Sequence, residues 1–226
     1  MEYFLPDAQN NHSEANFKRD IFICKAALEL FKGKKLRDIS PADIEKFKST
    51  RQKALTFRGK IRKPATVVRE LAVVSSIFSL AVKNDFIEYN PCKRVRRIKF
   101  DNMQNTVLSL EDETKFLESF ESEWARDICI MVLHTGLRKN DVLGLKKTEI
   151  NLDTNCIILI QGKTQRTVTI PMNETVRKLV ESRWNNGSDL IFPSPKTGKV
   201  GVDCKTAING ACRRAMISRV TLRDLR

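Results

Sequence analysis

Hydrophobic residues recur every three or four positions through most of the first ninety residues, which is the spacing of one face of an α-helix. The pattern predicts a helix over residues 13–33, a second that begins at Ser40 and Pro41, and a third over residues 64–84. Serine is a favoured N-cap and proline fits the first helical position, so the second helix has the best-marked start. A basic loop, residues 53–63, precedes the third helix. The first ninety residues are therefore predicted to be helical.

The pattern changes in the second half of the chain. Two β-rich runs, residues 156–160 and 167–170, flank a short polar loop and predict a β-hairpin. A capping box at Ser109 and another at Thr221 mark helix starts. Helices are predicted over about residues 109–120, 124–134, 173–184 and 203–218. The expected fold class is mainly α with a small antiparallel β-sheet.

A basic stretch with neither helical nor strand periodicity separates the helical first part of the chain from the mixed second part. Residues 91–105 contain five Lys and Arg between Lys93 and Lys99 and read as an interdomain linker. The chain is therefore predicted to hold an all-helical domain, residues 1–98, and a mixed α+β domain, residues 106–226.

The charge balance points to a polyanionic partner. The 226 residues include 41 Lys and Arg against 27 Asp and Glu, a net charge of +14. Residues 1–105 carry a net charge of +10 and residues 106–226 carry +4. The helical part is therefore predicted to supply most of the electrostatic attraction to the polyanion. Nucleic acid is the first candidate. We expect no membrane association, because no apolar run approaches the roughly 18 residues of a spanning helix and no signal-peptide pattern is present.

The cysteine pattern argues against a metal or disulfide framework. The six cysteines are far apart, with no CxxC and no Cys/His ligand spacing. Several stand in apolar stretches, where free cysteine packs as a small hydrophobe. We therefore expect reduced cysteines, a cytoplasmic location, and neither a metal nor another cofactor.

The sharpest chemical motif is HTGLRKNDVLGL, residues 134–145. Gly136 ends the preceding helix, so Arg138 emerges at a turn, and Asp141 one helical turn later is placed to orient it. A guanidinium in that position can clamp two phosphate oxygens.

This motif resembles the first conserved box of the tyrosine recombinases, the phage-integrase family. The segments LRDISPADIEKF and TVVRELAVVSSIFSLAVKNDFIEYNPC resemble that family's helical core-binding domain, so the resemblance spans nearly the whole chain. It implies a core-binding domain followed by a catalytic domain, clamped around double-stranded DNA. It also implies DNA recombination or integration by transesterification without a metal.

The resemblance assigns further catalytic residues. The hairpin QGKTQRTVTIP is similar to the family's lysine hairpin, which makes Lys163 the expected general acid. The ending VTLRDLR resembles the second box, with Arg226 as its arginine. Arg223 stands where the family usually has histidine, and arginine cannot act as a base near neutral pH. Two converging arginines would neutralise charge on the phosphate in the transition state.

In the family, the nucleophilic tyrosine lies downstream of the second box. Only Tyr3 and Tyr89 occur here, and both stand in the helical part. We therefore expect an incomplete catalytic domain that lacks the nucleophile. Such a chain would bind DNA without forming the 3′-phosphotyrosyl intermediate. Other protomers, in a tetrameric synapse, are the further partners that the resemblance implies for the full-length protein.

Six residues are predicted to contact DNA. Four stand in the helical part and two in the hairpin: Arg62, Lys63, Arg69, Lys83, Thr164 and Arg166.

Two alternatives remain open. The first is a catalytically inactive DNA-binding protein that keeps the recombinase fold. The second is a metal-dependent nuclease, because Asp153, Gln161 and Lys163 loosely resemble a D…(D/E)xK hairpin. A nuclease of that kind would lose its activity to a chelator.

Overall fold

The computed structural model describes residues 1–100, 107–161 and 165–226. The chain divides into two compact units, Met1–Asn102 and Met103–Arg226. The division falls inside the stretch that the sequence assigns to a linker.

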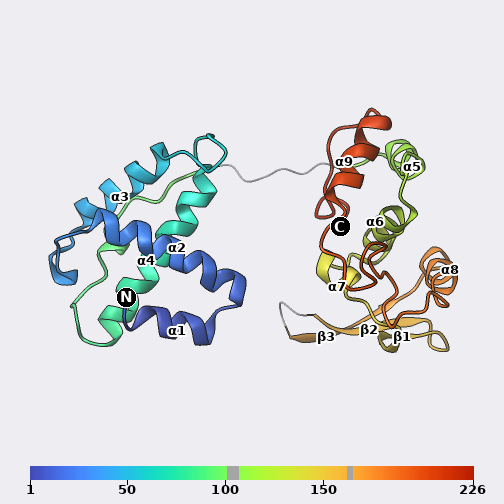
Figure 1. Cartoon of the computed structure of the whole chain (residues 1–226), viewed down its shortest axis with the longest axis horizontal. Coiled ribbons are helices and arrows are strands. Elements are labelled where there is room, and N and C mark those ends of the chain that lie inside the picture. Colours follow the sequence, from blue (N-terminus) through green and yellow to red (C-terminus); the bar gives the residue numbers. More distant parts are fainter. Residues whose placement is uncertain (101–106, 162–164) are drawn as a thin grey trace. The chain divides into compact units, whose positions relative to one another are not determined.

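The first unit is helical, as the sequence predicts (Figure 1). Its elements are α1 (Phe4–Asn11), α2 (Glu14–Leu30), η1 (Leu36–Asp38), α3 (Pro41–Lys53), α4 (Pro64–Lys83) and η2 (Pro91–Arg94). Helices α2, α3 and α4 match the three predicted helices within a few residues. Helix α1 was not predicted, because half of its eight residues are polar and its place depends on Phe4 and Ala8 packing against Cys24 of α2.

Helix α3 begins with the capping box that the sequence indicates. The Ser40 hydroxyl accepts a hydrogen bond from the Asp43 backbone N–H at 3.3 Å. The Asp43 carboxylate in turn accepts hydrogen bonds from the Ser40 backbone N–H at 2.9 Å and the Ser40 hydroxyl at 2.8 Å. Lys34 also donates to Asp43. These contacts hold the pKa of Asp43 at about 2, with the Lys34 hydrogen bond as the largest cause.

Helix α4 is the central helix of this unit and contacts α2, α3 and η2. Its residues Val74 and Phe78 are buried with Ile44 and Phe47 of α3 in one apolar cluster. By length and composition alone α4 is apolar enough to cross a membrane, with a mean hydropathy of 1.7. The sequence expectation that no segment reaches that length was therefore wrong. Within its unit, α4 buries five residues: Val67, Glu70, Val74, Phe78 and Ala81.

A buried carboxylate joins α4 to the end of α3. Glu70 is 3% exposed. It accepts two hydrogen bonds from Arg51, at 2.6 and 2.9 Å, and one from Arg62, at 2.7 Å. A buried charge of this kind is stable only when it is paired, and two guanidinium groups meet that need.

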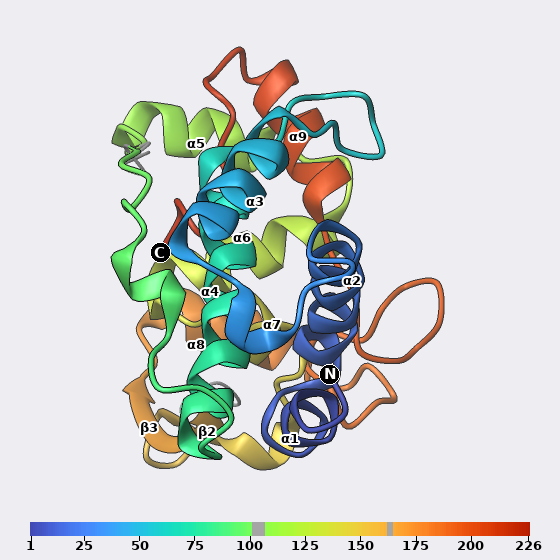
Figure 2. The same cartoon turned by 90° about the vertical axis from the view of Figure 1, so that its left-hand side faces the viewer.

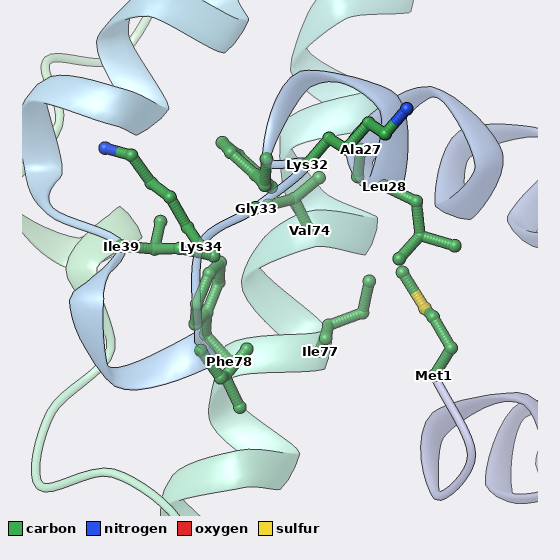
Figure 3. A pocket seen from close by; sticks show the side chains of 12 residues that line it. Met1, Ala27, Leu28, Lys32, Gly33, Lys34, Ile39, Val74, Ile77 and Phe78 are labelled. Carbon is green, nitrogen blue, oxygen red and sulfur yellow. The ribbon is translucent and has the colours of Figure 1, made fainter.

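An apolar cavity of about 390 Å³ opens beside α4. In Figure 3, Val74, Ile77 and Phe78 line it from α4 and Leu28 from α2, with Met1 at its edge. No site residue lies in its lining.

The second unit combines helices with a small sheet (Figure 1). Its elements are α5 (Leu110–Glu118), α6 (Glu123–Thr135), α7 (Lys139–Leu143), η3 (Lys147–Glu149), β1 (Ile150–Asn151), β2 (Cys156–Gln161), β3 (Arg166–Pro171), α8 (Glu174–Ser182) and α9 (Lys205–Arg214). The strands form one antiparallel sheet in the order β1-β2-β3. The predicted fold class, mainly α with a small antiparallel sheet, is confirmed.

One face of the sheet closes the core of this unit. Ile157 and Leu159 of β2 are buried with residues of α6, α8 and α9, whereas Ile158 and Ile160 face outward. The pairing runs from Cys156 opposite Pro171 to Gln161 opposite Arg166. The register therefore fixes Gln161 and Arg166 together at one end of the hairpin.

All six cysteines are free, and four of them are buried. Cys129, Cys204 and Cys212 belong to the core of the second unit. A hydrogen bond with Cys204, together with burial, raises the pKa of the Cys129 thiol above its ordinary value. Burial raises the pKa of Cys24 and of Cys92 to about 11. These thiols behave as small apolar groups, as expected.

Three details differ from the sequence prediction. Strand β1 was missed, because two residues are too few to give an alternating pattern. The first part of the predicted linker is ordered on the helical unit, where Lys48 donates to the Arg96 carbonyl at 3.0 Å and the Arg96 N–H donates to Glu45 at 3.1 Å. Thr221 and Asp224 do pair, at 2.7 Å, but they close a turn instead of opening a helix.

Candidate active site

The turn between α6 and α7 carries the first candidate residue. Gly136 adopts a left-handed conformation with φ 64° and ends α6, which is the role that the sequence gives it. Leu137 is buried and anchors the turn in the core. Arg138 follows as the N-cap residue of α7, in an extended conformation with a half-buried side chain. Its guanidinium is therefore carried at a fixed turn on a packed core.

The hairpin holds this arginine in place. Arg138 Nη1 donates a hydrogen bond to Oε1 of Gln161, the last residue of β2. The amide can accept without neutralising the cation, so the arginine keeps its positive charge for an anionic ligand. Sequence reasoning named Gln161 only within the nuclease alternative. The predicted general acid Lys163 and the predicted DNA contact Thr164 lie outside the described residues.

Arg226 reaches the same turn from the other end of the unit. Its Nε donates to the carbonyl oxygen of Gly136, two residues before Arg138. The turn before it is closed by Asp224, which accepts hydrogen bonds from the Thr221 backbone N–H at 2.8 Å and the Thr221 hydroxyl at 2.7 Å. The structure thus brings the two predicted arginines to one turn, although Gly136 and Arg226 are 90 positions apart.

Arg223 is exposed and lines a neighbouring cavity of about 360 Å³. Further cations line the same cavity, and sequence reasoning missed them: Lys139, Lys205 and Arg219. Lys139 directly follows Arg138, so its place in the motif was a usable signal. Lys205 and Arg219 had none, because the packing of α9 against the last residues of the chain places them there. Asn209 also lines the cavity, and its buried Oδ1 has no hydrogen-bond partner among the described residues.

Asp141 does not orient Arg138 through its side chain in the described structure. Its Oδ2 is buried and finds no hydrogen-bond partner in residues 1–100, 107–161 and 165–226. The two residues are linked through the backbone, where the Asp141 N–H donates to the Arg138 carbonyl at 2.9 Å. The orienting contact comes from Gln161 instead.

The predicted DNA contacts fall into two groups. Lys63, Arg69, Lys83 and Arg166 are exposed and stay predictions. Arg62 is engaged within the protein, because its guanidinium donates to buried Glu70 and its side chain is only 12% exposed. In the structure Arg62 links the loop before α4 to Glu70, and its contact with DNA stays a prediction.

Two residues of the nuclease alternative, Asp153 and Gln161, are described, and they lie at opposite ends of β2. Asp153 lies in the turn before β2, whereas Gln161 is the last residue of that strand. A strand of six residues separates two such positions by about 20 Å at 3.3 Å per residue. Among the described residues, no three His, Cys, Asp or Glu side chains gather as a metal site would require.

Comparison with known proteins decides the family. Residues 102–226, more than half of the chain, match the model of the Phage integrase family. This chain belongs to the phage integrase family. The resemblance inferred from the TGLR box is thereby confirmed.

Curated relatives of this integrase-family chain agree. It is 25% identical over 143 residues to the integrase of Escherichia phage P2, a match that covers 63% of this chain and 41% of the relative. It is 23% identical over 168 residues to tyrosine recombinase XerA of Pyrococcus furiosus, covering 72% of this chain and 58% of the relative. The chain thus spans about half the length of the curated relatives that it matches.

Solved structures share the fold of this integrase-family chain. A lambda integrase fragment, crystallised as a dimer bound to a COC′ core site, aligns with a TM-score of 0.76 and 18% identity, covering 100% of this chain and 81% of that one. The Tn1549 transposon integrase in complex with transposon right-end DNA aligns with a TM-score of 0.77 and 16% identity, covering 98% and 82%. At these identities the likeness concerns the fold.

Proposed function

We propose that this chain carries the phosphate-binding part of a site-specific DNA recombinase of the integrase type. The observation that carries the proposal is the meeting of Arg138 and Arg226 at the Gly136 turn. Arg226 contacts the turn that carries Arg138, so two guanidinium groups from distant segments are available at one turn for a single anionic group. A backbone phosphodiester is the anion that a family of DNA recombinases acts on.

The chemistry follows from the side chains. Arginine stays protonated at all physiological pH values and presents paired N–H donors, so it binds nonbridging phosphate oxygens without a metal. When a nucleophile attacks phosphorus, negative charge grows on those oxygens, and both guanidinium groups stabilise it. Lys163, on the hairpin whose strand Gln161 ends, would donate the proton that the leaving 5′-oxygen requires.

We further propose that these 226 residues bind DNA without forming a covalent intermediate. The Tyr3 ring packs at a tilt against Phe86 with ring centroids 5.1 Å apart, and Tyr89 lies under the Arg94 guanidinium at 4.8 Å. Both tyrosines belong to the helical unit and already have aromatic or cationic partners. Neither is part of the arginine site described above.

The partners follow the same reasoning. The lambda integrase relatives were solved as a dimer on a core site and as a tetramer on a Holliday junction. We propose double-stranded DNA as the ligand and further protomers on that DNA as the protein partners. A cytoplasmic site of action is consistent with six free cysteines, four of them buried.

The experiment incubates the chain with nicked duplexes of mixed sequence in EDTA and divides each sample. A native gel is expected to show a protein–DNA complex that chelator does not affect. A denaturing gel is expected to show no protein-linked DNA. Binding that requires a divalent ion would contradict the metal-independent site, and a protein-linked band would contradict the proposed absence of a nucleophile.

A further inference from the structure

The loop that joins α3 to α4 forms a tight, hydrogen-bonded turn, Leu55–Ile61, here called the tip turn. Leu55 and Ile61 pair as an antiparallel bridge at its base. The Thr56 N–H donates to the Lys60 carbonyl at 2.7 Å, and the Gly59 N–H donates back to the Thr56 carbonyl at 2.9 Å. Gly59 has φ +69°, which a three-residue hairpin loop needs at its last position. The turn is therefore built by its own backbone.

The tip turn exposes its apolar side chains to solvent. Phe57 at the apex is 106% exposed, and Ile61 and Leu55 are 71% and 60% exposed. Figure 2 shows this loop, in teal between α3 and α4, standing out from the helices of its unit. Three exposed apolar side chains are thus grouped on one ordered turn, and grouped apolar exposure of this kind marks a contact surface.

Cations stand next to Phe57 in the sequence. Arg58, Lys60 and Lys63 are exposed, and residues 51–63 contain no Asp or Glu. Buried Glu70 of α4 already holds Arg51 and Arg62. Those two ion pairs tie the last turn of α3 and the residue after the tip turn to α4, so the tip turn stands on a fixed base.

We propose that Phe57 is a wedge that enters the minor groove of duplex DNA, with Arg58, Lys60 and Lys63 on the flanking phosphates. The inference rests on the DNA binding proposed above and adds a contact that bends the duplex. A minor groove about 6 Å wide excludes a helix but admits one ring carried on a single turn. Apolar side chains inserted at a base step unstack it and kink the helix, and neighbouring cations offset the phosphate charge.

The test compares the wild type with Phe57→Ala and Phe57→Leu on short duplexes. The duplexes carry 2-aminopurine at a flexible TA step and a donor–acceptor pair at their ends. Wild type should raise 2-aminopurine emission and shorten the end-to-end distance. Phe57→Ala should lose most of both signals, while Phe57→Leu keeps part of them, because leucine is also found as a wedge. The salt dependence of binding should be unchanged, since no cation is removed.

Phe86→Ala is the matched control. Phe86 is an aromatic residue of the same unit, 50% exposed, beyond the opposite end of α4. Its replacement should leave both signals at the wild-type level. Thermal unfolding should be the same for wild type and Phe57→Ala, because the ring has no buried area to lose.

The outcomes separate the two proposals. If the wild type gives no binding isotherm on any duplex, the proposed function fails, and the wedge fails with it. If the wild type binds DNA but Phe57→Ala gives the same unstacking and bending, the wedge alone is overturned. Flotation with vesicles containing anionic lipid is run in parallel. Binding to vesicles that depends on Phe57, without DNA unstacking, would reassign the tip turn to a membrane surface.

Discussion

At the scale of single residues, the account depends on how two arginines are held. The Gly136 carbonyl accepts from Arg226, and Gln161 accepts from Arg138. Neither acceptor carries a full charge, so both cations keep their attraction for phosphate. A carboxylate in place of either acceptor would have offset part of the arginine's attraction for phosphate.

The sequence predicted Arg138 and Arg226 but not the group that holds Arg138. The turn followed from local chemistry, since glycine readily takes the left-handed conformation that ends α6. Gln161 depends on the register of β2 with β3 and on the packing of the sheet against α6. Those are long-range properties, so a motif on one segment could not reveal them. The role of Asp141, one helical turn away, as a second orienting group stays a prediction.

One prediction at this scale concerns Asp43. Its pKa is lowered to about 2 in the folded protein, from an ordinary value of 3.8. A lowered folded-state pKa adds stability that is fully present above pH 3.8 and is lost as the pH falls through about 2. The difference in unfolding free energy between wild type and Asp43→Asn should therefore be constant from pH 7 to 4 and shrink below it, as measured by urea titration.

Lys34→Ala serves as the companion variant. Because Lys34 is the largest cause of the lowered pKa, its removal should move the loss of stability to higher pH. A stability difference between wild type and Asp43→Asn that stays flat down to pH 2 would contradict the assignment.

At the scale of elements, helix α4 organises the first unit and the α6–α7 turn organises the second. Helices with a clear apolar stripe were predicted within a few residues, because burial of that stripe is what forms them. Two short elements were missed. Helix α1 has only one buried apolar pair, Phe4 and Ala8, within its eight residues, and β1 has only two residues and forms by pairing with β2.

The Glu70 bridge gives the prediction at this scale. Glu70→Gln removes the charge that compensates Arg51 and Arg62, both of which have side chains no more than 12% exposed. Breaking a buried ion pair by removing one partner typically costs about 3–5 kcal/mol. Denaturant unfolding should therefore show a loss of that order.

Glu14→Gln is the control for that measurement. Glu14 pairs with Lys18 at 2.6 Å on the surface, with a side chain that is 82% exposed. Surface pairs contribute about 0–1 kcal/mol, so the change should be small. Equal effects of the two substitutions would show that the Glu70 bridge is not a stabilising element.

At the scale of the whole molecule, charge is divided unevenly between two units. Residues 1–105 carry +10 and the remainder +4, while the arginine site lies in the less basic second unit. This division fits a protein whose first unit supplies most of the affinity for a polyanion and whose second unit handles one phosphate. The charge division was readable from the sequence. The meeting of Arg138 and Arg226 was expected from the two family motifs, but the contact of Arg226 with the Gly136 carbonyl depends on the fold.

The most direct test of the arginine site is the salt dependence of DNA binding. Affinity for a mixed-sequence duplex would be measured in EDTA at several salt concentrations for wild type, Arg138→Ala and the control Arg177→Ala. Arg177 lies on α8, is 43% exposed and pairs with Glu181 at 2.9 Å. If Arg138 holds a phosphate, its replacement should lower the slope of log K against log salt by about 1, while Arg177→Ala leaves it unchanged. A slope for Arg138→Ala equal to that of the wild type would contradict the account.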